Sequence, residues 1–363
     1  MKKTVDYITK TGKSSLGFGA MRLPGDDETA KMVDAYLDSG DMYFDTAYIY
    51  EGSEEKLGRT LVKRHPRSSY FVANKLPPWE IKKLSDRDKI FETQLKRTRL
   101  DYFDYYLVHS LDESREKSID ELELFEYVTK LKEKGHVRHV GFSFHGGTAC
   151  LDRLLTKYKQ TEFVQLQLNY MDILRGPAGE WQEVANKYNV PIIVMEPVKG
   201  GTLAKLPKGA EKLFKDYDSN RSIASWAIQY AANLEGVTCL LSGMSNMEQT
   251  NDNIKTFKNL KPLSAEEMAL IENVLGEMSK VSSIPCTACR YCVKDCPMDI
   301  DIAACFSLYN ELKRGGEAWN RKMLFGTMSR NAKHCTGCGA CMSHCPQHID
   351  IPKEMAVVAK ELG

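Results

Sequence analysis

Short apolar runs alternate with amphipathic stretches along most of the chain. Each run holds three to six residues, a length typical of buried β-strands. The eight runs lie at residues 16–20, 42–44, 70–73, 103–108, 137–142, 163–168, 192–195 and 238–241. Patterns typical of helices lie between them, including residues 28–38, 86–98, 119–134 and 222–233. Eight strand signals separated by helix signals over about 250 residues predict a (β/α)8 TIM barrel.

An open, doubly wound parallel sheet is the alternative that such an alternation allows. A dinucleotide-binding sheet of that kind carries a third glycine at a fixed distance from a Gly-x-Gly pair. Gly17 and Gly19 form such a pair, but no third glycine follows at that spacing. The pattern therefore favours the closed barrel.

Polar residues end three of the predicted strands. Asp45 follows the run at 42–44, Lys75 follows the run at 70–73, and His109 follows the run at 103–108. Tyr50 lies five residues after Asp45. An aspartate at such a place is usually a helix cap and a tyrosine is usually a packing residue, but barrels carry their chemistry at the carboxyl ends of their strands. The four residues together predict a proton-transfer site.

Composition narrows the class of protein. The chain has 363 residues, 42% hydrophobic composition and a formal net charge of +1, which describes a globular protein without the charge excess of a nucleic-acid binder. No apolar run reaches the length of about 18 residues that a membrane span requires. The first residues lack the apolar stretch of a signal peptide. We therefore expect a cytoplasmic protein with no nucleic-acid or membrane partner, and we expect residues 1–14 to form a short hairpin or lid.

Eight of the eleven cysteines fall into two runs with the same spacing. The runs are Cys286-x2-Cys289-x2-Cys292-x3-Cys296-Pro and Cys335-x2-Cys338-x2-Cys341-x3-Cys345-Pro. This is the bacterial 4Fe-4S spacing, in which the fourth cysteine of each run binds the other cluster. The predicted ligands are Cys286, Cys289, Cys292 and Cys345 for one cluster, and Cys335, Cys338, Cys341 and Cys296 for the other.

Zinc is the alternative metal, because Cys-x2-Cys pairs commonly bind it. Two complete four-cysteine runs that each end in Cys-Pro favour iron–sulfur clusters. The remaining cysteines, Cys150, Cys239 and Cys305, are expected to be buried small apolar residues.

The cysteine runs also mark a second domain. A helix with Ser264 as its N-cap is expected to run to about Lys280, and residues 281–285 look like a linker. We therefore predict a barrel over residues 1–280 and a small ferredoxin-like iron–sulfur domain over residues 281–363. Residues 303–313 favour a helix, so the second domain is expected to be mainly helical.

The residues Gly17–Pro24, with the sequence GFGAMRLP, precede the Asp45, Tyr50, Lys75 and His109 set. This arrangement resembles the aldo-keto reductase family over residues 5–275. The resemblance implies that Tyr50 is a general acid, that Asp45 pairs with and holds Lys75, and that His109 orients a carbonyl group. A free tyrosine has a pKa of about 10, and a lysine ammonium beside it favours the phenolate.

The resemblance also implies a nicotinamide dinucleotide, NADP or NAD, across the strand ends. The implied cofactor-binding residues are Met21, Asp45, Ser143, Gln165, Gly243, Ser245, Gln249 and Asn253. The chain departs from the family pattern at Phe144, where an asparagine is frequent, and at Met195, where an aromatic ring stacks on the nicotinamide. No arginine for a 2′-phosphate occurs within residues 245–254, and Lys255 or Lys199 is the expected substitute.

The leading hypothesis is an NAD(P)-dependent oxidoreductase that acts on a small carbonyl or alcohol and carries two 4Fe-4S clusters. The alternative is an electron-transfer or redox-sensing iron–sulfur protein in which the barrel is mainly a scaffold. Hydride transfer moves two electrons together, whereas a cluster normally carries one. Coupling the two domains therefore needs a flavin or a substrate radical as intermediary. A ferredoxin or a flavodoxin is an expected external electron donor in addition to the small-molecule substrate.

Overall fold

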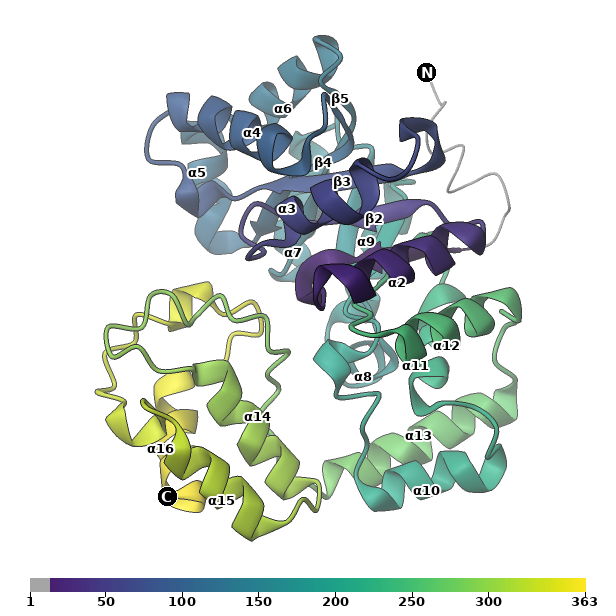
Figure 1. The fold of residues 1–363 in the computed structure, drawn as a ribbon, viewed down its shortest axis with the longest axis vertical. Coiled ribbons are helices and arrows are strands. Elements are labelled where there is room, and N and C mark those ends of the chain that lie inside the picture. Colours follow the sequence, from purple (N-terminus) through teal and green to yellow (C-terminus); the bar gives the residue numbers. More distant parts are fainter. Residues whose placement is uncertain (1–13) are drawn as a thin grey trace. The chain divides into compact units, whose positions relative to one another are not determined.

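The computed structural model describes residues 14–363, so the hairpin or lid expected at residues 1–14 lies outside the described residues except for Ser14. Eight parallel strands close into a barrel in chain order (Figure 1). The strands are β1 (Ser15–Gly19), β2 (Tyr43–Asp45), β3 (Phe71–Leu76), β4 (Phe103–Leu111), β5 (Val137–Phe144), β6 (Phe163–Gln167), β7 (Ile192–Met195) and β8 (Val237–Ser242). Each of the eight predicted runs becomes a strand, and the closed barrel excludes the open sheet.

Pairing between β1 and β8 closes the barrel, with Gly17 in register with Leu241. Gly17 faces a crowded interior. A Cβ atom at this position would lie 2.6 Å from Cδ2 of Leu241 and 2.8 Å from Sγ of Cys239. Only glycine fits such an approach without displacing its neighbours. The interior core to which Leu241 and Cys239 belong also holds Tyr43, Ala73, Tyr105, Leu107, Phe163 and Ile193.

Helices follow the strands in the chain (Figure 1). They are α2 (Asp26–Asp38), α3 (Ser53–Leu57), α4 (Ser85–Thr98), α5 (Glu116–Glu121), α6 (Leu124–Glu133), α7 (Thr148–Lys157), α8 (Tyr170–Arg175), α9 (Ala178–Lys187), α10 (Lys208–Tyr217), α11 (Ile223–Ala232), α12 (Met247–Lys258) and α13 (Ala265–Ser279).

The prediction of a single helix over residues 119–134 is wrong. The chain forms α5 and α6 instead, because Glu123 takes a left-handed conformation with φ 46° and interrupts the helix. Arg87 of α4 donates from Nη1 to the carbonyl oxygen of Leu122 at 2.6 Å and to that of Glu123 at 3.2 Å. These bonds satisfy carbonyl groups that a helix end leaves without a partner.

The described chain divides into two compact units. The first contains the barrel up to Pro197 together with Ser225–Leu263, and the second contains Val198–Ala224 together with Ser264–Gly363. The segment after β7 thus belongs to the same unit as the cysteine runs. The bounds of these units differ from the domain boundary predicted after residue 280. That domain boundary stays a prediction. As expected, Ser264 caps α13, where it forms a capping box with Glu267.

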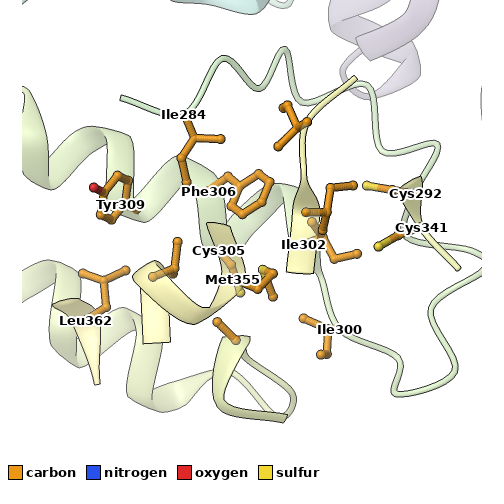
Figure 2. Packing of buried hydrophobic residues seen from close by; sticks show 14 of the residues in the cluster. Ile284, Cys292, Ile300, Ile302, Cys305, Phe306, Tyr309, Cys341, Met355 and Leu362 are labelled. Carbon is orange, nitrogen blue, oxygen red and sulfur yellow. The ribbon is translucent and has the colours of Figure 1, made fainter. Parts of the chain in front are cut away.

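Residues 281–363 form a mainly helical region, as predicted. Its helices are α14 (Ile302–Lys313), α15 (Ala318–Thr327) and α16 (Ile351–Leu362), and this described range contains no strand. The helices share one apolar core, in which Cys292 and Cys341 lie at one end and Tyr309 and Leu362 lie at the other (Figure 2).

Candidate active site and cysteine centre

Asp45 and Lys75 form a buried ion pair at the carboxyl ends of β2 and β3. Nζ of Lys75 lies 2.5 Å from Oδ1 of Asp45 and donates to the carbonyl oxygen of Thr46 at 2.8 Å. The Asp45 and Lys75 residues are only 3% and 1% exposed. Burial lowers the pKa of the Lys75 ammonium, but the charge of Asp45 and the contact with Tyr50 outweigh burial and raise it. Lys75 is therefore a fixed cation at neutral pH.

Tyr50 lies above this pair in the turn between β2 and α3. Nζ of Lys75 is 4.9 Å from the centre of the Tyr50 ring. The ring meets His109 edge-on, with 6.2 Å between the ring centres. The turn is fixed by backbone bonds, in which the amide of Tyr50 donates to Ala47 and the amide of Ser53 donates to Tyr50. The structure thus brings the four predicted catalytic residues together.

His109 lies beside an irregularity in β4 that positions its side chain. The pairing of β4 with β5 shifts register between Val108 and Leu111, and Ser110 takes a φ of 55°. The amide of Ser110 donates to Oγ of Ser143 on β5 at 2.7 Å, which holds the irregularity in place. Burial, followed by the nearby charge of Lys75, lowers the pKa of His109 well below its usual value. The imidazole is therefore neutral at neutral pH.

A buried polar network behind Lys75 was not predicted from the sequence. Oδ1 of Asn74 accepts from the Lys75 amide at 2.9 Å and from Nε2 of Gln94 at 2.8 Å. The same Gln94 nitrogen donates to the Lys75 carbonyl oxygen at 2.9 Å, and the Gln94 side-chain oxygen accepts from the Tyr106 hydroxyl at 2.6 Å. The strand position of Lys75 is therefore fixed by helix α4 from outside the barrel.

Glu54 and Arg97 extend this network to the loop that carries Tyr50. Oε1 of Glu54 accepts from Nδ2 of Asn74 at 2.7 Å, and Oε2 of Glu54 lies 3.0 Å from Nη1 of Arg97. The Arg97 guanidinium also lies 4.8 Å from the ring centre of Tyr48. Burial raises the pKa of Glu54 even though Asn74 and Arg97 oppose the shift. A glutamate in a short helix gives no sequence signal for such a role.

The residues predicted for the nicotinamide carboxamide are neighbours. Ser143 on β5 and Gln165 on β6 stand in register, and both are buried. Oε1 of Gln165 is buried and makes no hydrogen bond within residues 14–363. A buried carbonyl oxygen of this kind is costly unless a donor reaches it, and a carboxamide NH2 group is such a donor. The residues present therefore fit the nicotinamide end of the predicted cofactor. Met21 lies in the short 3-10 turn after β1.

The positions predicted for the adenosine end surround the start of α12. Oε1 of Gln249 accepts from the amide of Ser245 at 2.8 Å. Nδ2 of Asn253 donates to Oγ of Ser242 at 2.6 Å, and Asn253 is buried. The side chains of Gln249 and Asn253 thus shape the loop after β8.

An arginine does lie beside this loop, although none occurs within residues 245–254. Nη1 of Arg22 is 3.8 Å from the point where a Cβ atom on Gly243 would stand. Arg22 follows β1 and is therefore distant in sequence from the loop after β8, which is why the sequence did not indicate it. Lys255 is exposed on α12, and Lys199 belongs to the second compact unit.

Phe144 and Met195, the two positions at which the chain departs from the family pattern, both pack within the barrel. Phe144 is buried at the end of β5 and meets Trp181 edge-on, with 6.0 Å between ring centres. Met195 ends β7 and packs, partly buried, against the interior core of the barrel. Phe144 therefore packs internally at a position where the family often has asparagine.

Cysteines of both runs lie close together, and their crossed assignment to two clusters stays a prediction. One apolar pocket is lined by Cys296, Cys335, Cys338 and Cys341, with Ile300, Ile302 and Met355 among its other walls. Burial raises the pKa of the Cys292 thiol, and the next causes are the neighbouring thiols of Cys289, Cys286 and Cys345, followed by Cys341. Within residues 14–363, no three His, Cys, Asp or Glu side chains converge on a point that could hold a single metal ion. The donor set, with four cysteines in each run, and its spacing fit 4Fe-4S clusters.

The two cysteine runs belong to a repeat with an offset of 49 residues. Ala288 and Arg290 in the first run have φ values of 54° and 67°, and Gly337 and Gly339 at the equivalent places have 73° and 76°. Both loops therefore follow the same left-handed path, which glycine adopts readily and other residues adopt at a cost. Cys150, Cys239 and Cys305, outside the runs, are buried as predicted.

This geometry defines a barrel oxidoreductase that is joined to an iron–sulfur region. The model of the aldo/keto reductase family matches residues 15–275, and the chain belongs to this family. A 4Fe-4S dicluster domain matches residues 285–349. No helix in the described part of the chain is long and apolar enough to span a bilayer.

Known relatives match the barrel. An aldo-keto reductase of Mycolicibacterium paratuberculosis is 29% identical over 75% of this chain and 89% of its own length. The L-galactose dehydrogenase of Arabidopsis thaliana is 25% identical over 71% of this chain and 89% of its own. The holo form of an aldo-keto reductase from Bacillus halodurans superposes with a TM-score of 0.60 and 25% identity, covering 72% of this chain and 92% of that one.

Proposed function

We propose that this oxidoreductase reduces the carbonyl group of a small aldehyde or ketone with NADPH or NADH, or oxidises the corresponding alcohol. Tyr50 is the general acid, and two 4Fe-4S clusters carry electrons. The observation that supports the proposal most directly is the buried Lys75 ammonium, which lies 2.5 Å from Asp45 and 4.9 Å from the Tyr50 ring centre. In this proposal, residues 1–280 carry the carbonyl chemistry and residues 281–363 carry the clusters.

The proton comes from Tyr50. As the carbonyl carbon is reduced, its oxygen gains negative charge and takes the phenolic proton, which leaves a phenolate. The Lys75 ammonium stabilises this phenolate: two unit charges about 5 Å apart at an effective dielectric constant of about 20 attract by about 3 kcal/mol, and the Asp45 carboxylate beside the ammonium offsets part of this. Asp45 holds the ammonium in place, and neutral His109 donates an N–H group to the carbonyl oxygen.

The nicotinamide, when bound, supplies the hydride. Gln165 and Ser143 would hold its carboxamide, with Met21 and Asp45 near the adjoining ribose. Gly243, Ser245, Gln249 and Asn253 would receive the adenosine end. Arg22 is our candidate for the 2′-phosphate of NADP, because its guanidinium lies beside Gly243 and a guanidinium binds phosphate in a bidentate manner.

The clusters, when bound, supply one-electron transfer. Cys286, Cys289, Cys292 and Cys345 would hold one of them, and the second would be held by Cys335, Cys338, Cys341 and Cys296. The pocket lined by the four members of the second set supports this crossed assignment.

An anaerobic titration tests the cofactor assignments. Affinity for NADPH and NADH is measured by quenching of protein fluorescence, and turnover is measured with a panel of aldehydes and ketones. Gln165→Leu is expected to weaken both cofactors, because it removes the acceptor for the carboxamide. Arg22→Gln is expected to weaken NADPH by about tenfold and NADH much less, because it removes a charge-assisted bond to phosphate. Lys258→Gln, which alters an exposed lysine at the end of α12, serves as the matched control. An equal loss of both cofactors in Arg22→Gln would refute the role of Arg22.

A second titration asks whether the nicotinamide reduces the clusters. NADPH or NADH is mixed anaerobically with the loaded protein, without a carbonyl substrate, and the cluster absorbance is followed. Bleaching would show an internal route from the nicotinamide to the clusters. Clusters that stay oxidised at every cofactor concentration, yet are reduced by dithionite, would show that their electrons come from elsewhere.

A further inference from the structure

Helix α15 exposes large apolar side chains. Among the described residues, six large hydrophobic side chains are exposed, and three of them, Trp319, Met323 and Leu324, lie on this ten-residue helix. Trp319 is 72% exposed, more than any of the others. A single exposed leucine needs no explanation, whereas a group of exposed large apolar residues marks a surface that another molecule covers.

Two of these exposed residues share one face of the helix with a lysine. Trp319, Lys322 and Met323 are spaced at i, i+3 and i+4, which places them side by side along the helix. Phe325 points the other way and is only 1% exposed in the apolar core that also holds Cys292 and Cys341. Helix α15 thus has two apolar faces. One packs against the core of its own unit, and the other is not covered by any of the described residues.

The charge around this face is strongly positive. Residues 313–334 contain six lysines and arginines and only one acidic residue, although the whole chain has a net charge of +1. Lys313 and Arg321 are paired with Glu361 and Glu311. Lys322 and Arg330 form no ion pair with any residue in 14–363, so their charge is available to a partner.

We propose that Trp319, Met323 and Lys322 form the docking surface for an acidic one-electron carrier of the flavodoxin or ferredoxin class. Tryptophan and methionine are enriched where proteins bind one another, and complementary charge speeds the encounter. A two-fold contact between copies of this chain would bring like charges together, which disfavours a second copy as the occupant. The inference rests on the proposed electron-transfer role of the clusters. In each step the carrier loses one electron and one oxidised cluster gains it.

The test follows reduction of the clusters by a flavodoxin hydroquinone in anaerobic stopped flow, with the full chain loaded with iron and sulfide. Trp319→Ala and Lys322→Glu are each expected to lower the second-order rate about tenfold, the size of effect typical of important interface residues. The rate should fall with added salt in the unaltered chain and should depend less on salt in Lys322→Glu. Leu84→Ala and Lys83→Glu alter an exposed leucine and an exposed lysine of the barrel and should leave the rate unchanged.

Reduction by dithionite separates the outcomes. Equal dithionite reduction in all variants shows that the clusters are intact, and an unchanged flavodoxin rate in Trp319→Ala and Lys322→Glu would then overturn the docking surface. Binding to anionic phospholipid vesicles that these substitutions abolish, with no change in the flavodoxin rate, would assign the surface to a membrane instead and would also overturn the proposal. A chain without reducible clusters would overturn the proposed electron-transfer role, and the docking inference with it.

Discussion

Gly200→Ala is expected to loosen the first cysteine loop, because the turn after β7 lies against that loop within the second compact unit. Gly200 has a φ of 60°, and a Cβ atom on it would lie 2.5 Å from Cα of Thr287, the residue after Cys286. Ordinary contact begins at 3.4 Å, so the two segments must separate by about 1 Å to admit the methyl group.

The cysteine loop cannot retreat freely from such a methyl group. The side chain of Asn310 on α14 accepts from the Ile284 amide at 2.8 Å and donates to the Ile284 carbonyl oxygen at 2.7 Å. Arg314, which directly follows the same helix, donates to Oγ1 of Thr202 at 3.2 Å. Both sides of the contact are thus tied to α14. Overpacking at a held site typically costs about 1–3 kcal/mol, to which a left-handed alanine adds about 1–2 kcal/mol.

Gly201→Ala is the matched control. Gly201 also has a positive φ, of 99°, but a Cβ atom there has no neighbour within 4 Å. Alanine at Gly201 therefore carries at least as much backbone strain as alanine at Gly200, but without the collision. We expect Gly200→Ala to lose iron to a chelator markedly faster than Gly201→Ala and to unfold about 1–3 kcal/mol more easily in anaerobic urea titrations. Equal behaviour of the two variants would show that the contact with Thr287 does not support the cluster loop.

Three further predictions concern the charged site and the metal. Lys75→Met should lower carbonyl reduction and move the onset of alcohol oxidation to higher pH, because the phenolate loses its cation; an unchanged pH–rate profile would contradict this role. Because the pKa of His109 is lowered in the folded protein, the unfolded chain binds a proton at this residue below about pH 6.5 and the folded chain does not. The free energy of unfolding should therefore decrease as the pH falls through this range, and it should decrease less in His109→Gln. Urea midpoints of both chains between pH 8 and pH 5 measure the difference, and parallel curves would count against it. Protein prepared anaerobically should hold about eight iron and eight sulfide per chain, and should bleach in air; stoichiometric zinc in protein made with iron available would refute the cluster assignment.

The sequence predicted the barrel because its strands are buried on both sides and so appear as apolar runs that end at polar residues. Asp45, Lys75 and His109 stand out for that reason. No such signal marks the irregularity at Ser110 that positions His109. The hydrogen bonds of Asn74 and Gln94 that hold Lys75 leave no signal either, because they depend on which helix packs behind which strand. The break at Glu123 was missed for a similar reason: the carbonyl groups it frees are satisfied by a distant arginine.

The cysteine spacing predicts two equivalent loops, and the structure gives both loops the same left-handed path. The contact of Gly200 with Thr287 could not be predicted, since it joins segments that are far apart in the chain and have no shared periodicity. Arg22 beside Gly243 was missed for the same reason. Spacing within a loop can be recognised in a sequence, whereas a contact between loops is decided by the fold.

The central claim is that Tyr50 supplies the proton for carbonyl reduction, and Tyr50→Phe tests it most directly. The substitution removes the hydroxyl group but keeps the ring, so nicotinamide affinity measured by fluorescence should not change. A positioned general acid typically contributes about 10²- to 10⁴-fold. We therefore predict that single-turnover reduction of an aldehyde by the bound dinucleotide falls by about that factor. Reduction at the rate of the unaltered chain, with the cofactor bound equally well, would contradict the account.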